Sequence, residues 1–485
     1  MISKNKVVLI TVLLTLGVIS AKLVGQITCS PKTINSEIVK TINDDLFLLS
    51  DKGCSRATAY ASMSKIVFIN DVCIVAWLGL DEDKFIPTIA VYDLKEKKIV
   101  NRYAFDESVD NHGGPALVLD SQNKIHVFYY PHSNEQIKYK TGDLTDGNEI
   151  IWECQKNIGE PNLTYPNPVY HKDQGVLLFA RKTPIIYGPD PPPAYVFFKS
   201  DEEFDQRHEF IVSRDSGYAS FHSRVLLSNK KIQVLSTILE NTDNIVGKTV
   251  TISYIESMDN GETWQKDHKN KIKYWQKGQL IEGDTLQTNN LITANNTNII
   301  ENGGRVNGTA LGAIGITNNR NCVNAFYIKE QVSSSKLIKA TKKKGKDTWI
   351  KTPISDLIYP KLENQRIVAP TGNLVKHKNL ILISGVLQND IPGTMSRWGN
   401  KSNSVVLLAK VKGKYKKLIE FKSKQNCVWF PYMQTNGNDV VLIFTKKKSK
   451  VTIVSNKDAS VLTEVFLFHT KLDDLLKKDF EVISI

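Results

Sequence analysis

Short apolar runs separated by turn residues cover most of the chain, and they predict strands rather than helices. Runs such as Val72–Leu78, Lys124–Tyr130, Lys231–Ile238 and Ser404–Val411 are rich in β-branched and aromatic residues and are bounded by Gly, Asn, Asp or Lys. Beyond the N-terminal segment, the one helix expected is Lys471–Lys478. Many short strands indicate an all-β sandwich, barrel or propeller. A chain of 485 residues is long for one sandwich, so radial repetition of sheets in a propeller is favoured.

The N-terminal segment has the pattern of an export signal. Lys4 and Lys6 precede the apolar run Val7–Ser20, and small or polar residues follow. The run is shorter than the roughly 20 apolar residues that a membrane helix needs. We therefore expect residues 1–26 to be a cleaved signal peptide and residues 27–485 to form a single domain. The mature protein is expected to be secreted or periplasmic, without stable membrane insertion.

Six cysteines are scattered along the chain, and none forms a C-x-x-C pair. In an exported protein one disulfide is possible, for instance between Cys54 and Cys73, but the sequence cannot assign pairs. Buried free thiols are the alternative.

The charge balance favours an anionic partner. The chain has 63 Lys and Arg residues against 50 Asp and Glu residues, which gives a net charge of +13. The runs Lys342–Lys344 and Lys446–Lys448 are interpreted as solvated loop ends. A general positive field attracts polyanions, either nucleic acid or a sulfated or uronic-acid polysaccharide. The sequence has no zinc-finger spacing, basic helix or RNA-binding aromatic signature, so the polysaccharide is preferred over nucleic acid.

One local motif favours the propeller. Residues 257–264 have the form S-x-D-x-G-x-T-W and resemble an Asp-box, which occurs at hairpin turns of β-propellers. Asp259 is expected to bond the turn backbone, Gly261 to supply a positive φ, and Trp264 to pack under the next strand. Because the motif is a folding device, Asp259 is interpreted as structural and not catalytic.

Two histidines occupy turns at the ends of one predicted strand. His112 lies in a glycine-rich turn, and His132 follows Pro131 just after the strand. Such an arrangement can bring both side chains to one rim of a sheet. Since imidazoles exchange protons near neutral pH, the pair indicates acid/base chemistry. His126, which alternates with apolar neighbours, is interpreted as a core residue.

Several motifs together resemble a known group. They are D-N-H-G-G-P-A around His112, Y-Y-P-H ending at His132, Y-P-N-P-V starting at Tyr165, and L-F-A-R ending at Arg181. They resemble the BNR-4 group of β-propeller proteins. Within that group, the chain most resembles the seven-bladed ulvan lyases of polysaccharide lyase family 25. This resemblance rests on the pairing of His112 with His132 and of Tyr165 with Arg181. The resemblance covers about residues 55–265 and is loose beyond them. It implies an all-β, seven-bladed propeller.

The resemblance also implies an activity. Such lyases cleave ulvan, a sulfated polymer of rhamnose and uronic acid, by β-elimination at the uronate, and leave an unsaturated uronic acid. Arg181 would pair with the uronate carboxylate and stabilise the enolate-like charge. His112 and Tyr165 would supply the base and the acid, in an order that the sequence leaves open. His132 would assist. Tyr218 and Arg224 would contact substrate.

The remaining expectations concern cofactors, partners and alternatives. The chain has no H-E-x-x-H or EF-hand motif. Catalysis is predicted to need no metal, a structural ion is left open, and the protein is expected to act as a monomer on an anionic polysaccharide. A sialidase-like glycoside hydrolase is one alternative, suggested by the Asp-box alone, and it would need two facing carboxylic acids or a Tyr–Glu pair. A non-catalytic carbohydrate-binding propeller is the other.

Overall fold

The computed structural model describes most of the chain. The described residues are 30–34, 40–108, 110–129, 135–182, 194–212, 219–228, 231–241, 248–261, 263–264, 272–276, 279–283, 286–287, 291–293, 298–305, 310–319, 321–331, 334–346, 348–362, 364–368, 372–389, 400–448 and 461–485. Residues 1–26, the predicted signal peptide, lie outside them.

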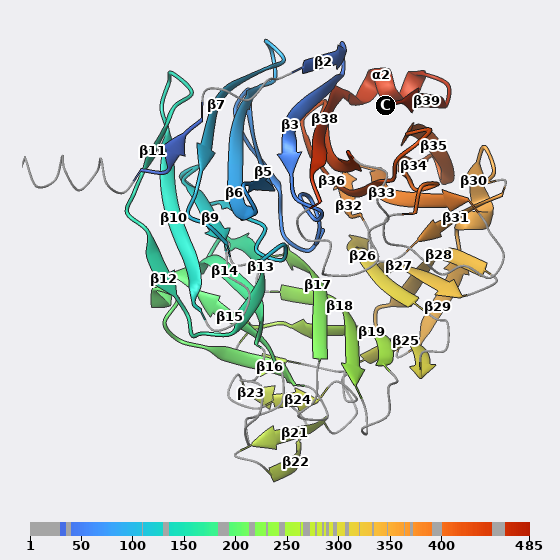
Figure 1. Ribbon diagram of the computed structural model, residues 1–485. Helices are drawn as coiled ribbons and strands as arrows, with labels where there is room; N and C mark the ends of the chain where they lie inside the picture. The colour runs from blue at the N-terminus through green and yellow to red at the C-terminus, as the bar shows by residue number, and fades with distance from the viewer. Residues whose placement is uncertain are drawn as a thin grey trace, which may run out of the picture.

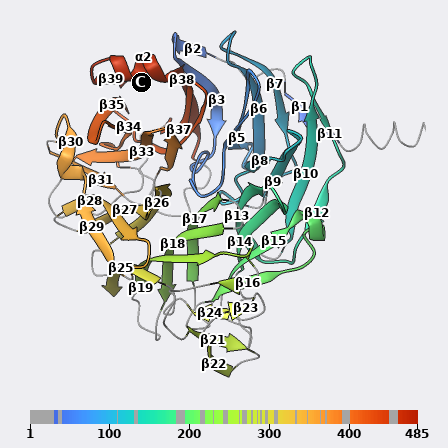
Figure 2. The same ribbon diagram turned by 180° about the vertical axis from the view of Figure 1, so that it is seen from behind.

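Antiparallel sheets are arranged around a central axis (Figures 1 and 2). One strand from each of seven groups lines a cavity at the centre, which we call the axial cavity. These strands are β4 (Ile66–Ile69), β8 (Ala116–Leu119), β13 (Leu163–His171), β17 (Ala219–Ser228), β26 (Ala310–Asn319), β32 (Leu374–His377) and β36 (Val428–Asn436).

In the first three groups, the chain runs outward from the inner strand as an antiparallel meander. The first group continues with β5 (Val72–Asp81), β6 (Lys84–Asp93) and β7 (Lys98–Ala104), which pairs with β1 (Lys32–Thr33). The second continues with β9 (Ile125–Tyr129), β10 (Ile137–Leu144), β11 (Ile150–Trp152) and β12 (Lys156–Ile158). The third continues with β14 (Gly175–Lys182), β15 (Ala194–Lys199), the 3-10 turn η1 (Ser200–Glu202) and β16 (His208–Val212). Beyond this meander, β24 (Leu291–Thr293) pairs with β16 in parallel, and β21 (Ile272–Gln276) and β22 (Gln279–Gly283) follow it in the sheet.

The next three groups repeat the pattern. The fourth contains β18 (Lys231–Asn241), β19 (Lys248–Ser257) and β25 (Asn298–Arg305), and a two-stranded sheet of β20 (Thr263–Trp264) and β23 (Leu286–Gln287) follows β19. The fifth contains β27 (Cys322–Gln331), β28 (Ser334–Lys343) and β29 (Trp349–Pro353). The sixth contains η3 (Ser355–Leu357), β30 (Ile358–Tyr359), β31 (Gln365–Val368), β33 (Leu380–Asn389), β34 (Ser404–Val411), β35 (Lys414–Lys422) and β39 (Glu481–Ser484). In this group β30 and β39 pair with β35 in parallel.

The last group joins the two ends of the chain. It contains β37 (Asp439–Lys447), β38 (Thr463–Lys471), β3 (Leu46–Gly53) and β2 (Lys40–Asn43), and the helix α2 (Leu472–Lys477) follows β38. Strand β3 pairs with β38 in antiparallel register, with Leu46 opposite Phe468. Both views show blue β3 beside red β38. The ring is therefore closed by strands from opposite ends of the sequence.

The core lies between neighbouring groups, because both faces of most sheets are covered. In β5 every residue except the terminal Asp81 is buried. One hydrophobic cluster packs β5 and β6 against β8, β9 and β11, and others fill the further interfaces around the ring. The predicted β-propeller class is confirmed. The predicted number of seven blades stays a prediction, which the seven groups support.

The Asp-box turn forms between β19 and β20. The Ser257 hydroxyl accepts a hydrogen bond from Gly261 N (2.7 Å) and donates one to the Asp259 carboxylate (2.8 Å). Gly261 has φ +90°, as predicted. Trp264 is buried, and its ring meets that of Phe197 on β15 edge-on. The motif therefore fastens the fourth group of strands to the third.

The cysteines correct one expectation. Cys54 and Cys73 are both free and buried, so the suggested disulfide between them is wrong and the free-thiol alternative holds for this pair. The two residues pack in different hydrophobic clusters. Burial raises the pKa of the Cys54 thiol to about 12. Cys154 is disulfide-bonded.

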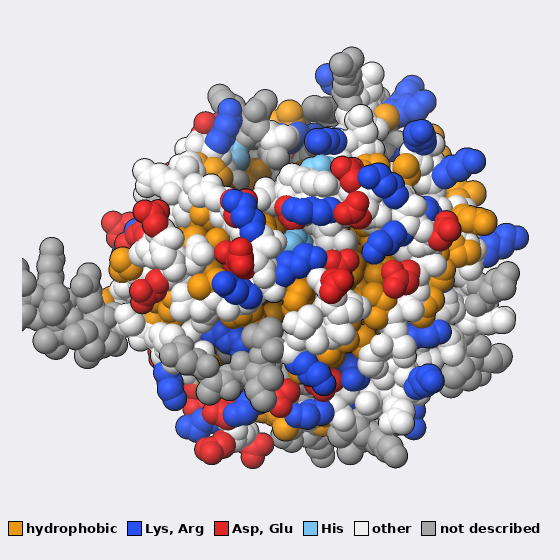
Figure 3. Space-filling model, turned by 90° about the horizontal axis from the view of Figure 1, so that it is seen from above, with side chains coloured by type: hydrophobic (Ala, Val, Ile, Leu, Met, Phe, Trp, Pro, Cys, Tyr) orange, Lys and Arg blue, Asp and Glu red, His pale blue; other side chains and the backbone are white. Residues whose placement is uncertain are grey.

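The surface in Figure 3 mixes charges of both signs, with Lys and Arg interspersed among Asp and Glu. Exposed pairs such as Lys52–Asp81 and Lys95–Asp71 are examples of this arrangement. Among the described residues, no helix has both the length and the apolar character to cross a membrane.

Candidate active site

His112 is held by the loop that precedes β8. Asp110 Oδ1 accepts hydrogen bonds from the His112 backbone N–H (2.7 Å) and lies 3.0 Å from His112 Nδ1. Arg56 Nη1 contacts His112 Nε2. Since a guanidinium has no acceptor, Nε2 must accept this bond, and the ring proton is assigned to Nδ1, facing Asp110. The sequence therefore builds an imidazole of fixed orientation and tautomer.

Tyr165 and Arg181 come from two paired strands beside this loop. The register of β13 and β14 shifts between Thr164 and Asn167, and Tyr165 takes φ +57° inside this bulge. Bulges re-aim side chains. The Arg181 guanidinium lies over the Tyr165 ring at 4.7 Å, and Arg181 Nε donates to Thr164 Oγ1 (2.8 Å). Arg181 is 2% exposed, and its guanidinium is therefore held among these contacts.

The structure brings together His112, Tyr165 and Arg181, three of the four predicted site residues that lie within the described residues. The His112 and Tyr165 rings have centroids 6.4 Å apart, and Arg181 stacks on Tyr165. Their catalytic roles stay predictions. Two other predicted site residues, His132 and Tyr218, lie outside the described residues.

Three further residues join the cluster and were not predicted. Tyr60 lies 4.7 Å from Tyr165 between ring centroids, and its hydroxyl accepts a hydrogen bond from Arg56. The His222 ring, on β17, lies 5.1 Å from that of Tyr165 and stacks parallel to Tyr60 at 6.1 Å. His222 has no distinctive spacing in the sequence, because its ring partners Tyr60 and Tyr165 come from distant parts of the chain.

Burial and positive charge determine the protonation of the cluster. Burial, followed by the nearby charges of Arg181, Arg224 and Arg56, lowers the pKa of His222 to about 3. Burial raises the pKa of Tyr60 well above its usual value. At neutral pH the cluster therefore combines a neutral His222 and a protonated Tyr60 with the guanidinium charges of Arg56 and Arg181, an arrangement suited to an anionic ligand.

Lys65 lies beneath the loop that carries His112. It is fully buried, and its Nζ donates to the Pro115 carbonyl (2.6 Å). Burial lowers its pKa from 10.5 to about 7. Its ammonium group therefore ties the end of the His112 loop to the segment before β4.

Arg224, the predicted substrate contact on β17, lies in the axial cavity. Its Nε donates to Ile314 O (3.1 Å) and its Nη2 to Gly372 O (3.0 Å). His126, in contrast, is a core residue as interpreted: it contacts the Tyr139 hydroxyl at 2.7 Å and Asp120 at 3.3 Å. In the described residues, no group of three or more His, Cys, Asp and Glu side chains could hold a metal ion.

Comparison with known proteins places this geometry in context. The model of a family described as "BNR repeat-containing family member" matches residues 74–356. No curated protein sequence matches the chain. Among solved structures, the polysaccharide lyase Uly1 is similar, with a TM-score of 0.57 and 12% identity over 89% of this chain and 99% of that one.

A second solved protein is an ulvan lyase of polysaccharide lyase family 25. Its structure bound to -[GlcA(1-4)Rha3S]- has a TM-score of 0.58 and 12% identity, and the match covers 88% of this chain and 98% of that one. Another structure of an ulvan lyase of that family has a TM-score of 0.58 at 14% identity, with the same coverage. At these identities the likeness shows the fold.

Proposed function

The chain belongs to the BNR repeat-containing family, and from this premise we propose that it is a secreted polysaccharide lyase that cleaves ulvan or a similar sulfated, uronate-containing polymer by β-elimination. The proposal rests on the close approach of the His112, Tyr165 and Arg181 side chains. An imidazole, a phenol and a guanidinium are the groups that this reaction needs. A solved protein of the same fold binds a glucuronate–rhamnose sulfate ligand, which supports the substrate class.

The first requirement is to stabilise charge at the uronate. Removing the C5 proton beside a carboxylate builds enolate-like charge on that group. Arg181 can grip the carboxylate through a bidentate contact, and Arg56 adds a second positive charge close by. The neutral His222 can donate a hydrogen bond in the same region without titrating.

The second requirement is proton transfer. The assigned tautomer leaves the lone pair of His112 Nε2 as the acceptor, so His112 is proposed as the base that takes the C5 proton. Asp110 stabilises the imidazolium that results. Tyr165 is proposed to protonate the leaving O4 oxygen. Substrate must displace Arg56 from Nε2, and the uronate carboxylate supplies a new partner for that guanidinium.

Two features support action outside the cell. Cys154 is disulfide-bonded, and disulfides persist in oxidising compartments. The N-terminal residues have the pattern of an export signal.

The test is incubation of the purified protein with ulvan. Elimination creates an unsaturated uronate that absorbs in the ultraviolet, hydrolysis creates reducing ends without this absorbance, and binding alone creates neither. Tyr165→Phe and His112→Gln should each lower the rate of absorbance gain at least 100-fold, the lower range for loss of general acid–base catalysis. Full activity in both variants, or reducing ends without absorbance, would refute the proposal.

A further inference from the structure

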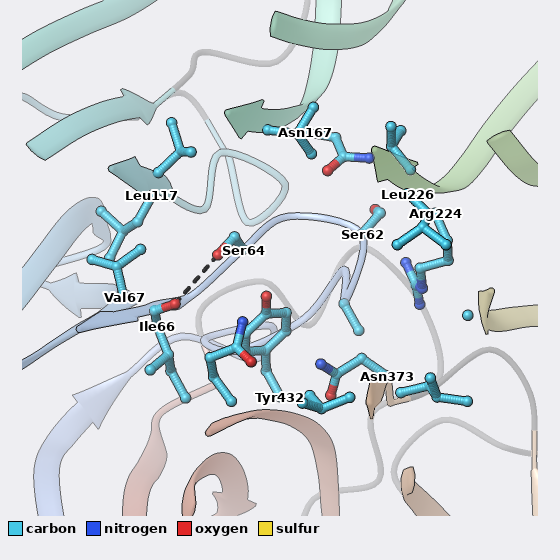
Figure 4. Close-up of a pocket in the computed structure, with 18 of the residues that line it drawn as sticks. Ser62, Ser64, Ile66, Val67, Leu117, Asn167, Arg224, Leu226, Asn373 and Tyr432 are labelled. Carbon is cyan, nitrogen blue, oxygen red and sulfur yellow. Dashed lines mark hydrogen bonds between the residues drawn. The ribbon is translucent and has the colours of Figure 1, made fainter. Parts of the chain in front are cut away.

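The described residues that line the axial cavity include positively charged side chains and no negatively charged ones. Its volume is about 620 Å³, and its lining contains Arg224 and Lys376 but no Asp or Glu among the described residues. Figure 4 shows Arg224 reaching into the cavity between Ser62 and Asn373. A volume of this size and a few polar groups among apolar walls are features typical of ligand sites.

Arg224 follows His222, a residue of the candidate active site, on the same strand β17. His222 and Arg224 are two residues apart on β17, so their side chains share one face and are separated by roughly 7 Å along the strand. Arg224 contributes to the low pKa of His222. The cavity therefore begins beneath the cluster and extends along the axis of the ring.

The charge of Arg224 is not neutralised by the contacts that hold it. Its two acceptors, Ile314 O and Gly372 O, are neutral carbonyls and use two of the five N–H groups of the guanidinium. Throughout the described ranges, no carboxylate forms an ion pair with it. Burial lowers its pKa to about 10, so it remains charged at neutral pH. A partly buried guanidinium of this kind would gain charge-assisted hydrogen bonds from an anion.

We propose that the inner end of the axial cavity binds a tetrahedral oxyanion, a sulfate group that is either free or carried by a sugar. The planar fork of Arg224 matches such a group. Ser62, which is buried in the same lining, offers a hydroxyl. The volume exceeds that of one sulfate ion and accommodates a sulfated monosaccharide. This site is separate from the proposed elimination and does not depend on it.

Calorimetric titration of the full-length protein with sodium sulfate tests the proposal, with sodium chloride at equal ionic strength as the reference. Wild-type protein should show one saturable site, and Arg224→Met should lower its affinity at least tenfold. Lys376→Met is the matched control, because Lys376 is exposed, lines the same cavity and donates to Asn318 O. It should change the affinity less than twofold.

The source of the anion is distinguished by a second titration with a sulfated monosaccharide. Tenfold tighter binding than inorganic sulfate assigns the site to a sugar-borne group, and equal affinity assigns it to the free ion. Absence of saturable binding to wild type, or unchanged affinity in Arg224→Met, would overturn the proposal. If Arg224→Met does not fold, Arg224→Lys keeps the charge without the fork and should weaken binding several-fold. These titrations contain no polymer, so their failure is distinct from failure of the proposed lyase activity.

Discussion

Asp110→Asn isolates the contribution of one carboxylate to the proposed base. In the structure Asp110 Oδ1 lies 3.0 Å from His112 Nδ1, and the two side chains are 32% and 11% exposed. A hydrogen bond to a charged group contributes roughly 1.5–3 kcal/mol. The exposure of Asp110 permits solvent screening, which places the loss near the lower end, at about 1.5–2 kcal/mol. At about 1.4 kcal/mol per decade, the expected result is a roughly 10–30-fold lower kcat.

The matched control is Asp120→Asn, which alters the same kind of pair elsewhere. Asp120 Oδ2 lies 3.3 Å from Nε2 of the core residue His126, outside the cluster. Its kcat on ulvan should stay within about twofold of wild type. Both variants are assayed by ultraviolet absorbance after circular dichroism has shown that they are folded. An Asp110→Asn variant as active as wild type, or equal losses in both variants, would refute the assigned role of Asp110.

Two further predictions concern stability. Lys65→Met removes a buried amine whose pKa is lowered from 10.5 to about 7, and the unfolded chain holds that proton more tightly between these values. The difference between the free energies of unfolding of wild type and variant should therefore change in favour of wild type from pH 7 to pH 9, by at most about 1.4 kcal/mol per pH unit. Urea titrations measure this difference at each pH, and a difference that does not change with pH would contradict the prediction. Gly261→Ala places a Cβ on a residue with φ +90° and 2.9 Å from Phe197 Cζ. Thermal or urea unfolding should therefore show a free energy of unfolding about 1–3 kcal/mol lower than that of wild type. An unchanged free energy of unfolding would contradict the role of this turn.

Much of the fold could be predicted because its signals are local. The expected strand at Ser404–Val411 matches β34, and the expected strand at Val72–Leu78 lies within β5. The expected helix at Lys471–Lys478 contains α2. Turn residues mark the ends of these runs, so few long-range contacts are needed to find them. The positive φ of Gly261 could be predicted for the same reason, since the hydrogen bonds of the Asp-box turn join residues at most four positions apart.

Within the candidate site, the sequence predicted the residues that lie in recognisable motifs and missed those that do not. His112, Tyr165 and Arg181 lie in recognisable motifs, and the structure brings them together. Tyr60, in the segment before β4, and His222, on β17, reach the same cluster from distant parts of the chain, and nothing in their local sequence indicates it.

The contacts of Arg224 could not be predicted from its local sequence either. The sequence suggested a substrate contact, but its carbonyl acceptors lie 90 and 148 residues further along the chain. Spacing along the sequence carries no information about contacts of this range.

The pairing of β3 with β38 has a consequence for biogenesis. Leu46 and Phe468 are partners, so the circle cannot shut until almost the whole polypeptide has been made. Contacts this remote in sequence are slow to form, because the entropy of a long loop must be lost first. A nascent chain therefore leaves this edge of β3 without its partner until β38 (Thr463–Lys471) has been synthesised.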